Sequence, residues 1–377
     1  MEKYDTIFND SNEILEKINL QEKPDIIIGN PPYVPLSKMI DIKNKSDNNS
    51  FLEKLCGNLY IGALYRAIEL VKDNGIISYI IPKNFLHVNA YSEIRRKILN
   101  ENTIVSVIDI GAYFKQVRGE QIILTIKKQA PESEHKIHFK KYKKGRLIHS
   151  FQLNQEFYQD KIVIFKNQQD FKIYNKFMNS YEVLGDFCRG FVGRGTSKAI
   201  SAVKGKEIRK FCFKGRDIPT TGDKIFIQNI YSAESGIIGC FAGGLDAGET
   251  VTVLTDSNSD MCRFLLGILH SRLCNYYLFK YCYNSSKLTM HTDAKYLLQI
   301  PVIKDTDYFD GIVTLVKNIE NLDYLSMEWY RMYEELNLMI YDLYKINTKE
   351  KNYIEKEVKE IQSKRWVSCD GKKAANE

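Results

Sequence analysis

Short apolar runs that alternate with helical patterns constrain the fold of the first third of this chain. Strands are predicted at residues 5–8, 25–29, 75–82, 104–111 and 120–128, and helices at 58–75 and 89–102. Strands that are apolar almost throughout are buried on both faces of a sheet, and helices between them connect strands that run in one direction. The pattern therefore predicts an α/β domain with a mostly parallel, doubly wound sheet. Ligands of such sheets bind outside the carboxyl ends of the strands.

The sequence changes character beyond about residue 150. Glycines cluster between short β-like runs, and two long helical patterns follow at 261–283 and 308–346. We expect the charged segment 348–364 to form a solvated helix and the tail 370–377 to be disordered. The chain is therefore predicted to have three parts, at residues 1–150, 151–305 and 306–377.

The composition excludes several classes of protein. No apolar run approaches the length that spans a bilayer, and the first ten residues lack the basic and apolar regions of a signal peptide. The 8 cysteines occur without a CxxC pair, which argues against a zinc site and in favour of reduced thiols. We therefore expect a cytoplasmic protein with no metal site and no membrane partner.

Positive charge is concentrated in one stretch of the chain. The net charge is +7, but residues 189–216 contain nine Lys or Arg residues and a single acid, Glu207. Phe191, Phe211 and Phe213 are interleaved with these charges, and a second basic run covers residues 136–149. One basic run is usually a solvated surface. Two runs in one chain, the first of them with aromatic residues, favour a polyanion as partner.

The tetrapeptide Asn30-Pro31-Pro32-Tyr33 directly follows the predicted strand 25–29. The prolines make a stiff, extended ledge, on which the Asn30 amide oxygen and the Pro31 carbonyl can point into one cleft. Two such acceptors suit an amino group with two hydrogens, because they favour a tetrahedral nitrogen whose lone pair can attack. Tyr33 offers a ring on which a base can stack, worth about 1–3 kcal/mol. A turn that merely ends a strand is the simpler interpretation, and the full tetrapeptide after an apolar strand argues against it.

The motif GNPPY resembles the catalytic motif of adenine-specific DNA methyltransferases, which use S-adenosylmethionine. Further segments are similar, in order, to gamma-class enzymes of restriction–modification systems: NLYIGALYRAIELVKDNGIISYIIPKNFL, AYSEIRRKIL, IVSVIDIGAYFKQVRGEQIILTIKK, FVGRGTSKAI, FKGRDI, SSKLTMHTDAKYLLQIPV and LMIYDLYKI. The resemblance runs from about residue 5 to residue 360. It implies a Rossmann-like methyltransferase sheet, then an α+β target-recognition domain with closing helices. It also implies that the enzyme methylates adenine in duplex DNA after base flipping.

The resemblance assigns roles to individual residues. Asn30, Pro31, Pro32 and Tyr33 would hold the target amine and base. Phe114 would stack on the flipped adenine, with a core aromatic at a strand end as the alternative. Asp10, with Asn30 and Pro32, would contact the cofactor, although a helix N-cap explains Asp10 equally well. The residues expected to contact DNA are Arg189, Arg194, Lys198, Arg209, Lys214 and Arg216.

One part of the family pattern has no counterpart in this sequence. The family places two strands ahead of the position of Asp10, one with a Gly-containing loop that grips the cofactor and one with an acid for its ribose. We therefore expect weak or absent S-adenosylmethionine binding by this chain alone, as one half of a split or truncated enzyme. A separate cofactor-binding half, or self-association through the unpaired strand 25–29, would meet this need. The alternatives are an inactive DNA-binding remnant or specificity module, and an RNA or protein-glutamine methyltransferase.

Overall fold

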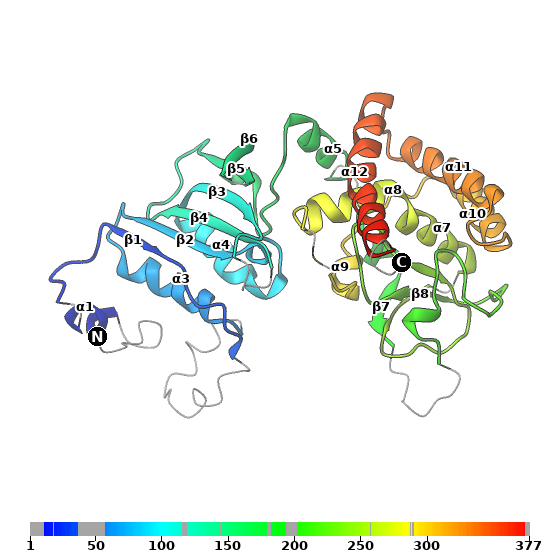
Figure 1. Ribbon diagram of the computed structural model, residues 1–377, viewed down its shortest axis with the longest axis horizontal. Helices are drawn as coiled ribbons and strands as arrows, with labels where there is room; N and C mark the ends of the chain where they lie inside the picture. Colours follow the sequence, from blue (N-terminus) through cyan, green and yellow to red (C-terminus); the bar gives the residue numbers. More distant parts are fainter. Residues whose placement is uncertain are drawn as a thin grey trace. The chain divides into compact units, whose positions relative to one another are not determined.

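The computed structural model of the chain divides into two compact units, Met1–Gln168 and Gln169–Glu377, which are described one at a time (Figure 1). The structure describes residues 11–17, 19–36, 57–114, 119–143, 145–178, 182–193, 202–256, 258–286, 288 and 290–361, and the backbone as far as Lys373. The strand predicted at residues 5–8 lies outside these residues.

The first unit is built on a six-stranded sheet with the order β1-β2-β4-β3-β5-β6. Its strands are β1 (Ile26–Gly29), β2 (Ile76–Pro82), β3 (Thr103–Gly111), β4 (Gln121–Lys127), β5 (Lys136–Lys143) and β6 (Arg146–Asn154). Its helices are α1 (Ser11–Lys17), α3 (Leu59–Leu70) and α4 (Ser92–Glu101), with 3₁₀ turns η2 (Lys83–Leu86), η3 (Asn89–Tyr91) and η4 (Gln155–Phe157). The four strands predicted from residue 25 to residue 128 are thereby confirmed. The first predicted helix ends at Leu70 rather than Gly75, because Val71 is already extended.

Four of the six strands point in the same direction. β1 and β2 are parallel, as are β3 and β5, whereas β4 runs antiparallel to both β2 and β3 and β6 runs antiparallel to β5. The predicted mostly parallel sheet is confirmed in this sense. Strands β5 and β6 were missed, and most of them comes from the basic run 136–149. Ile137 and Phe139 alternate with polar residues in β5 and are both buried, which the charge of the run obscured.

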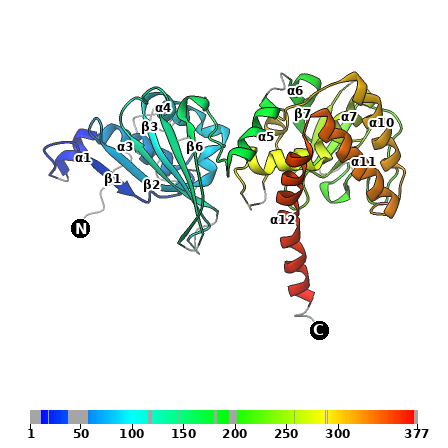
Figure 2. The same ribbon diagram turned by 90° about the horizontal axis from the view of Figure 1, so that it is seen from above.

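The two faces of this sheet differ in burial. Helices α3 and α4 pack on one face of the sheet (Figure 2). Side chains such as Ile77, Val107 and Leu124 are buried. On the opposite face, Ile28, Ser78 and Thr125 lie in one row across three strands, and none of them is buried. The expectation of burial on both faces is therefore wrong for the described residues, because the helices that pack on these strands lie on the first face.

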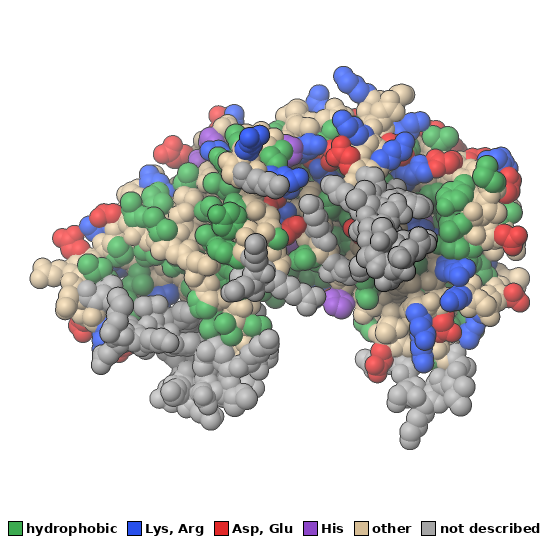
Figure 3. All heavy atoms as spheres, viewed as in Figure 1, with side chains coloured by type: hydrophobic (Ala, Val, Ile, Leu, Met, Phe, Trp, Pro, Cys, Tyr) green, Lys and Arg blue, Asp and Glu red, His purple; other side chains and the backbone are tan. Residues whose placement is uncertain are grey.

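Strand β1 forms one edge of the sheet among the described residues. It pairs only with β2, so the backbone groups on its other side have no strand partner in this part of the chain. Ile26 and Ile28 are 59% and 77% exposed, although both are strongly apolar. Hydrophobic side chains are visible on the surface of this unit (Figure 3). An edge strand such as β1, with exposed isoleucines, can pair with a further strand.

The second unit combines a four-stranded antiparallel sheet, with the order β7-β10-β8-β9, and a group of helices. The strands are β7 (Arg189–Val192), β8 (Lys224–Gln228), β9 (Gly239–Phe241) and β10 (Val251–Thr255). The helices are α5 (Gln168–Met178), α6 (Leu184–Phe187), α7 (Ser259–His270), α8 (Arg272–Tyr277), α9 (Ala294–Leu297), α10 (Thr306–Glu320), α11 (Met327–Leu343) and α12 (Thr348–Lys373), with a 3₁₀ turn η5 (Gly205–Glu207) and a π-helical turn η6 (Leu278–Cys282).

The long helical patterns of this unit are interrupted. The pattern at 261–283 breaks at Ser271, whose backbone is extended and whose side chain accepts a hydrogen bond from the Cys274 N–H. The pattern at 308–346 forms two helices, α10 and α11. Helix α12 is not fully solvated as expected, because Ile354 and Val358 are buried, and its backbone continues to Lys373, within the predicted disordered tail. None of the described helices is long and apolar enough to cross a membrane.

Arg95 of α4 is fully buried and connects three segments of the first unit, through bonds to Phe85, Val88 and Asp160. Its Nη1 donates to the carbonyls of Phe85 (2.8 Å) and Val88 (2.7 Å), and its Nη2 lies 2.7 Å from Asp160 Oδ1. We expect Arg95→Met to lower the free energy of unfolding of this unit by about 3–5 kcal/mol, because it leaves buried acceptors unpaired. Urea titration beside Arg96→Met, which changes an exposed neighbour, measures the effect. Equal midpoints for the two variants would contradict it.

Candidate active site

The NPPY segment lies at the carboxyl end of β1, where ligands of such sheets bind. Gly29 is in register with Tyr79 of β2, and a Cβ on Gly29 would lie 3.2 Å from the Tyr79 ring, so glycine allows the ring to approach. Beyond the motif, Leu36 N donates to Gly57 O at 2.9 Å, and Pro35 forms a bridge with Asn58, the N-cap of α3. The ledge is thus fixed at both ends, by β1 and by the start of α3.

Asn30 and Tyr33 contact each other within this ledge. The Tyr33 hydroxyl lies 2.7 Å from Asn30 Oδ1 and 2.8 Å from the carbonyl oxygen of Ile80, at the end of β2. Asn30 and Pro32 are exposed, Pro31 is buried and Tyr33 is half-buried. Burial raises the pKa of Tyr33 to about 12, so its hydroxyl stays protonated and remains a donor. A hydroxyl has one hydrogen to share between its two acceptors, and the amide oxygen of Asn30 retains a lone pair for a ligand.

Buried aromatic side chains pack against the Tyr33 ring of the ledge. The Tyr33 ring stands edge-on to Tyr60 at 6.1 Å, and Tyr60 stands edge-on to Tyr91 at 5.6 Å. Tyr60 and Tyr91 are buried, and Phe85 stacks on Tyr91 at 6.4 Å. Edge-to-face pairs of this kind favour one relative orientation of the rings. The Tyr33 ring is therefore held in place before any base arrives.

Phe114 lies three residues beyond the carboxyl end of β3, on the side of the sheet where the NPPY segment follows β1. It is half-buried, and its ring stands edge-on to the ring of Tyr113 at 5.3 Å. Two strands separate β3 from β1, which places the two strand ends roughly 14 Å apart at normal strand spacing. Both aromatic side chains predicted to hold a base thus lie beyond carboxyl strand ends on one edge. Asp10, predicted to contact the cofactor, lies outside the described residues.

A cluster of four charged side chains lies near the end of β3, and two of the four, Lys83 and Asp109, are buried. Lys83 Nζ is 2.9 Å from Asp109 Oδ2 and 3.3 Å from Glu120 Oε2, and Lys141 Nζ is 3.1 Å from Asp109 Oδ2. Burial raises the pKa of Asp109, but Lys83 and Lys141 outweigh burial and lower this pKa to about 2. Burial and the charge of Lys83 lower the pKa of Lys141. This cluster was not predicted from the sequence, where its one signal is an acid, Asp109, within the apolar run IVSVIDIG.

The residues predicted to contact DNA fall into three groups. Arg189, Lys214 and Arg216 are exposed. Arg209 is half-buried, with its guanidinium 5.0 Å from the centre of the Tyr324 ring, so part of its role is packing. Arg194 and Lys198 lie outside the described residues. Lys and Arg side chains are visible on the surface of this unit (Figure 3).

The phenylalanines interleaved with these charges have different surroundings. Phe211 and Phe213 are buried, and Phe213 belongs to the core of the small sheet with Phe226 and Val253. Phe191 on β7 is 49% exposed, beside Arg189 on the same strand. Of these three phenylalanines, only Phe191 is therefore exposed to a ligand.

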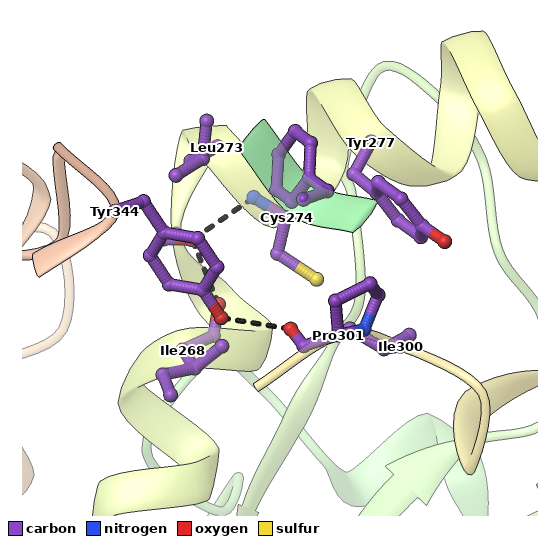
Figure 4. A pocket seen from close by; sticks show the side chains of 9 residues that line it. Ile268, Leu273, Cys274, Tyr277, Ile300, Pro301 and Tyr344 are labelled. Carbon is purple, nitrogen blue, oxygen red and sulfur yellow. Dashed lines mark hydrogen bonds between the residues drawn. The ribbon is translucent and has the colours of Figure 1, made fainter. Parts of the chain in front are cut away.

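A small cavity in the second unit does not provide a cofactor site. Its lining includes Ile268, Cys274, Tyr277 and Tyr344, and its volume is about 10 Å³, room for no more than one water molecule (Figure 4). Burial raises the pKa of the Cys274 thiol, so it is protonated and a poor nucleophile. The six cysteines that the structure describes are free, and its described residues contain no group of side chains arranged to hold a metal ion.

Comparison with known proteins points to one class. Residues 1–115, which include Asn30, Tyr33 and Phe114, match the family described as Eco57I restriction-modification methylase. The chain is 28% identical over 130 residues to the type II restriction enzyme and methyltransferase RM.Eco57I of Escherichia coli, covering 32% of this chain and 13% of that protein. It is 38% identical over 78 residues to the modification methylase CviBIII of Paramecium bursaria Chlorella virus NC1A, covering 20% of this chain and 19% of that protein.

A solved structure extends the similarity over both units. The type IIL restriction-modification enzyme MmeI, solved in complex with DNA, has a TM-score of 0.50 and 11% identity, covering 95% of this chain and 59% of that chain. At this identity the similarity shows the fold alone. The fold of this chain is similar to that of MmeI, and the sequence matches support a restriction–modification methyltransferase. The matched part of this chain spans between 13% and 28% of the length of these curated relatives.

Proposed function

We propose that this chain supplies the catalytic residues for transfer of a methyl group from S-adenosylmethionine to the exocyclic amine of adenine in duplex DNA. The main support is the contact between Tyr33 and Asn30, which fixes an amide oxygen at the carboxyl end of β1. The family match over residues 1–115 includes both side chains. The similarity to restriction–modification methyltransferases makes DNA the substrate class of this proposal.

The chemistry depends on activating a weak nucleophile. The lone pair of the adenine amine is delocalised into the ring, and the amine has two hydrogens. Asn30 Oδ1 and the Pro31 carbonyl accept these hydrogens, favour a tetrahedral nitrogen and so release the lone pair for attack. S-adenosylmethionine, when bound, supplies an electrophilic methyl group. The methylated nitrogen is positively charged and loses one of its protons readily, so the ledge needs no strong base.

The base must leave the duplex before it reaches this ledge. Flipping costs a few kcal/mol in unpairing and unstacking. In this proposal Tyr33 and Phe114 stack on the flipped adenine and offset part of that cost, at about 1–3 kcal/mol for each stacked contact. The half-buried, edge-on packing of both rings limits the conformational freedom that they lose on binding.

The described residues fit one side of a cofactor site. Asn30 and Pro32 are exposed and available to a cofactor beside β1, and no described strand lies beyond β1. We propose that a second polypeptide adds a parallel strand to this edge, supplies the cofactor-gripping loop, and covers Ile26 and Ile28 with a helix. The support is that parallel sheets are normally covered on both faces, whereas no described helix buries the row formed here by Ile28, Ser78 and Thr125.

Reconstitution tests this proposal. This chain is mixed with a polypeptide that carries the cofactor-gripping loop of a restriction–modification methyltransferase, tritiated S-adenosylmethionine, and several kilobases of unmethylated duplex made by polymerase chain reaction. We expect tritium in the DNA only when both polypeptides are present, and no micromolar binding of S-adenosylmethionine to this chain alone by calorimetry. Micromolar binding by a monomer of this chain would refute the division of the site between two polypeptides.

DNA binding by this chain is expected to depend strongly on salt. Arg189, Lys214 and Arg216 are exposed and can neutralise phosphates, releasing counterions. Arg216→Ala should reduce the slope of log affinity against log salt by about 1, whereas Lys349→Ala, an exposed lysine of α12, should leave it unchanged. Fluorescence anisotropy with a labelled duplex across a salt series measures both slopes. Equal slopes for the two variants would remove Arg216 from the DNA contacts.

A further inference from the structure

The backbone that leads to Phe114 is held from within the sheet by two buried side chains. The first is Asp109, the third-last residue of β3, whose side chain is 3% exposed. Its Oδ1 accepts a hydrogen bond from Gly111 N at 2.9 Å, while its Oδ2 faces Lys83 and Lys141. Gly111 has a φ of +64°, in the region that favours glycine, so the chain turns at the residue that Asp109 holds.

The second side chain is Gln121, the first residue of β4, which is 1% exposed. Its Oε1 accepts from Tyr113 N at 3.1 Å, and its Nε2 donates to Gly119 O at 2.8 Å. One amide therefore contacts the backbone on both sides of Phe114. Tyr113 N also lies 3.0 Å from Gly111 O, which links the two points of attachment.

The charged cluster orients Asp109. Lys83 follows β2, and Glu120 precedes β4. Lys141 is directly opposite Asp109 in β5. The four charges therefore connect four strands on the side of the sheet where β2 and β3 end. Two cations and two anions balance each other. With both lysines on Oδ2, the remaining oxygen of Asp109 is directed to Gly111. The ends of β2, β3 and β4 are thereby fixed in relation to the segment that contains Phe114.

We propose that Asp109 and Gln121 are positioning residues, which hold the segment Gly111–Phe114 so that the Phe114 ring meets a flipped base. This inference rests on the proposed function, because it takes from that function the role of Phe114. Both side chains act on the backbone near Phe114 and need no contact with substrate or cofactor. Other strand residues that make hydrogen bonds within the sheet, such as Ser78 and Thr125, lie away from this segment.

Gln121→Met is the most informative variant. It keeps the length and apolar packing of the side chain but removes both hydrogen bonds to the segment. Asp109→Asn is less suitable as a first test, because it removes the carboxylate that the Lys83 and Lys141 ammonium groups share and endangers the fold. Thr125→Val is the matched control, since it lies on the same strand and removes one hydrogen bond, to Ser78, away from Phe114.

Hydrogen exchange of this chain alone, followed by mass spectrometry of peptides covering residues 111–114, gives a readout that needs no activity. We expect Gln121→Met to speed exchange there roughly tenfold, and Thr125→Val to leave it unchanged. In the reconstituted system, Gln121→Met should lower kcat for methylation roughly tenfold and leave KM for S-adenosylmethionine unchanged.

The outcomes separate this inference from the proposed function. Unchanged exchange in Gln121→Met would show that the side chain does not hold the segment. Faster exchange with unchanged kcat would show that the segment does not act in the reaction, and the inference would fail while wild-type methylation upheld the proposed function. Absence of methylation by the wild-type pair would overturn the proposed function and, with it, the role of Phe114 on which the inference rests.

Discussion

Asn30→Ala is expected to abolish methyl transfer by the reconstituted enzyme, with a loss of at least about 100-fold in kcat. The variant removes the amide oxygen that the Tyr33 hydroxyl contacts at 2.7 Å, and with it one of the two acceptors that activate the amine. DNA affinity should change by less than about twofold, because phosphate contacts dominate it. Tritium incorporation and anisotropy measure the two effects separately.

Two further variants make this prediction specific. Tyr33→Phe keeps the ring but removes the hydroxyl that holds Asn30, so we expect an intermediate loss of roughly tenfold in kcat. Asn84→Ala makes the same change as Asn30→Ala at another exposed asparagine, just beyond β2 on the same edge of the sheet, and should have no effect. Normal turnover by Asn30→Ala, or an equal loss in Asn84→Ala, would contradict the mechanism.

The second large effect is expected at the open edge of the sheet. Ile28 is 77% exposed, so Ile28→Asp should change the stability of this chain by less than about 1 kcal/mol. In the complex, however, the carboxylate would be buried against the added polypeptide. Association should therefore weaken at least about 100-fold, and methylation should be lost.

Leu147→Asp provides the matched control for this prediction. Leu147 is 52% exposed on β6, which is the opposite edge strand of the same sheet. The variant therefore places the same charge on an apolar surface to which the second polypeptide is not proposed to bind. Sedimentation of the mixed polypeptides measures association, and urea titration checks that each variant is folded. If Ile28→Asp associates as well as wild type, or if Leu147→Asp fails equally, the second polypeptide does not bind where we propose.

The predicted strands between residues 25 and 128 are confirmed because their apolar runs are long and bounded by clear stops. Strand β5 was not predicted, because Ile137 and Phe139 are only two apolar residues among several lysines. The predicted burial of the sheet was too high, because an apolar strand such as β1 does not show in its own sequence whether anything covers it. Burial of Ile28 depends on a neighbour, and none is present among the described residues.

The candidate site was predictable to the extent that it is local in sequence. Asn30 and Tyr33 are three residues apart, so a motif can reveal them, and their contact follows from the stiffness of the prolines between them. Lys83 and Asp109 are 26 residues apart and meet only through the strand order β2-β4-β3, which the sequence did not specify. Likewise, nothing in the basic stretch distinguished the exposed Phe191 from the buried Phe211.

In the proposed reaction the methyl group is transferred to the exocyclic amine of adenine. DNA from the reconstituted reaction is digested to nucleosides, and the methylated nucleoside is identified by mass spectrometry. We expect N6-methyladenine, present with the wild-type chain and absent with Asn30→Ala. Methylated cytosine in its place, or N6-methyladenine that persists in Asn30→Ala, would contradict the proposed reaction.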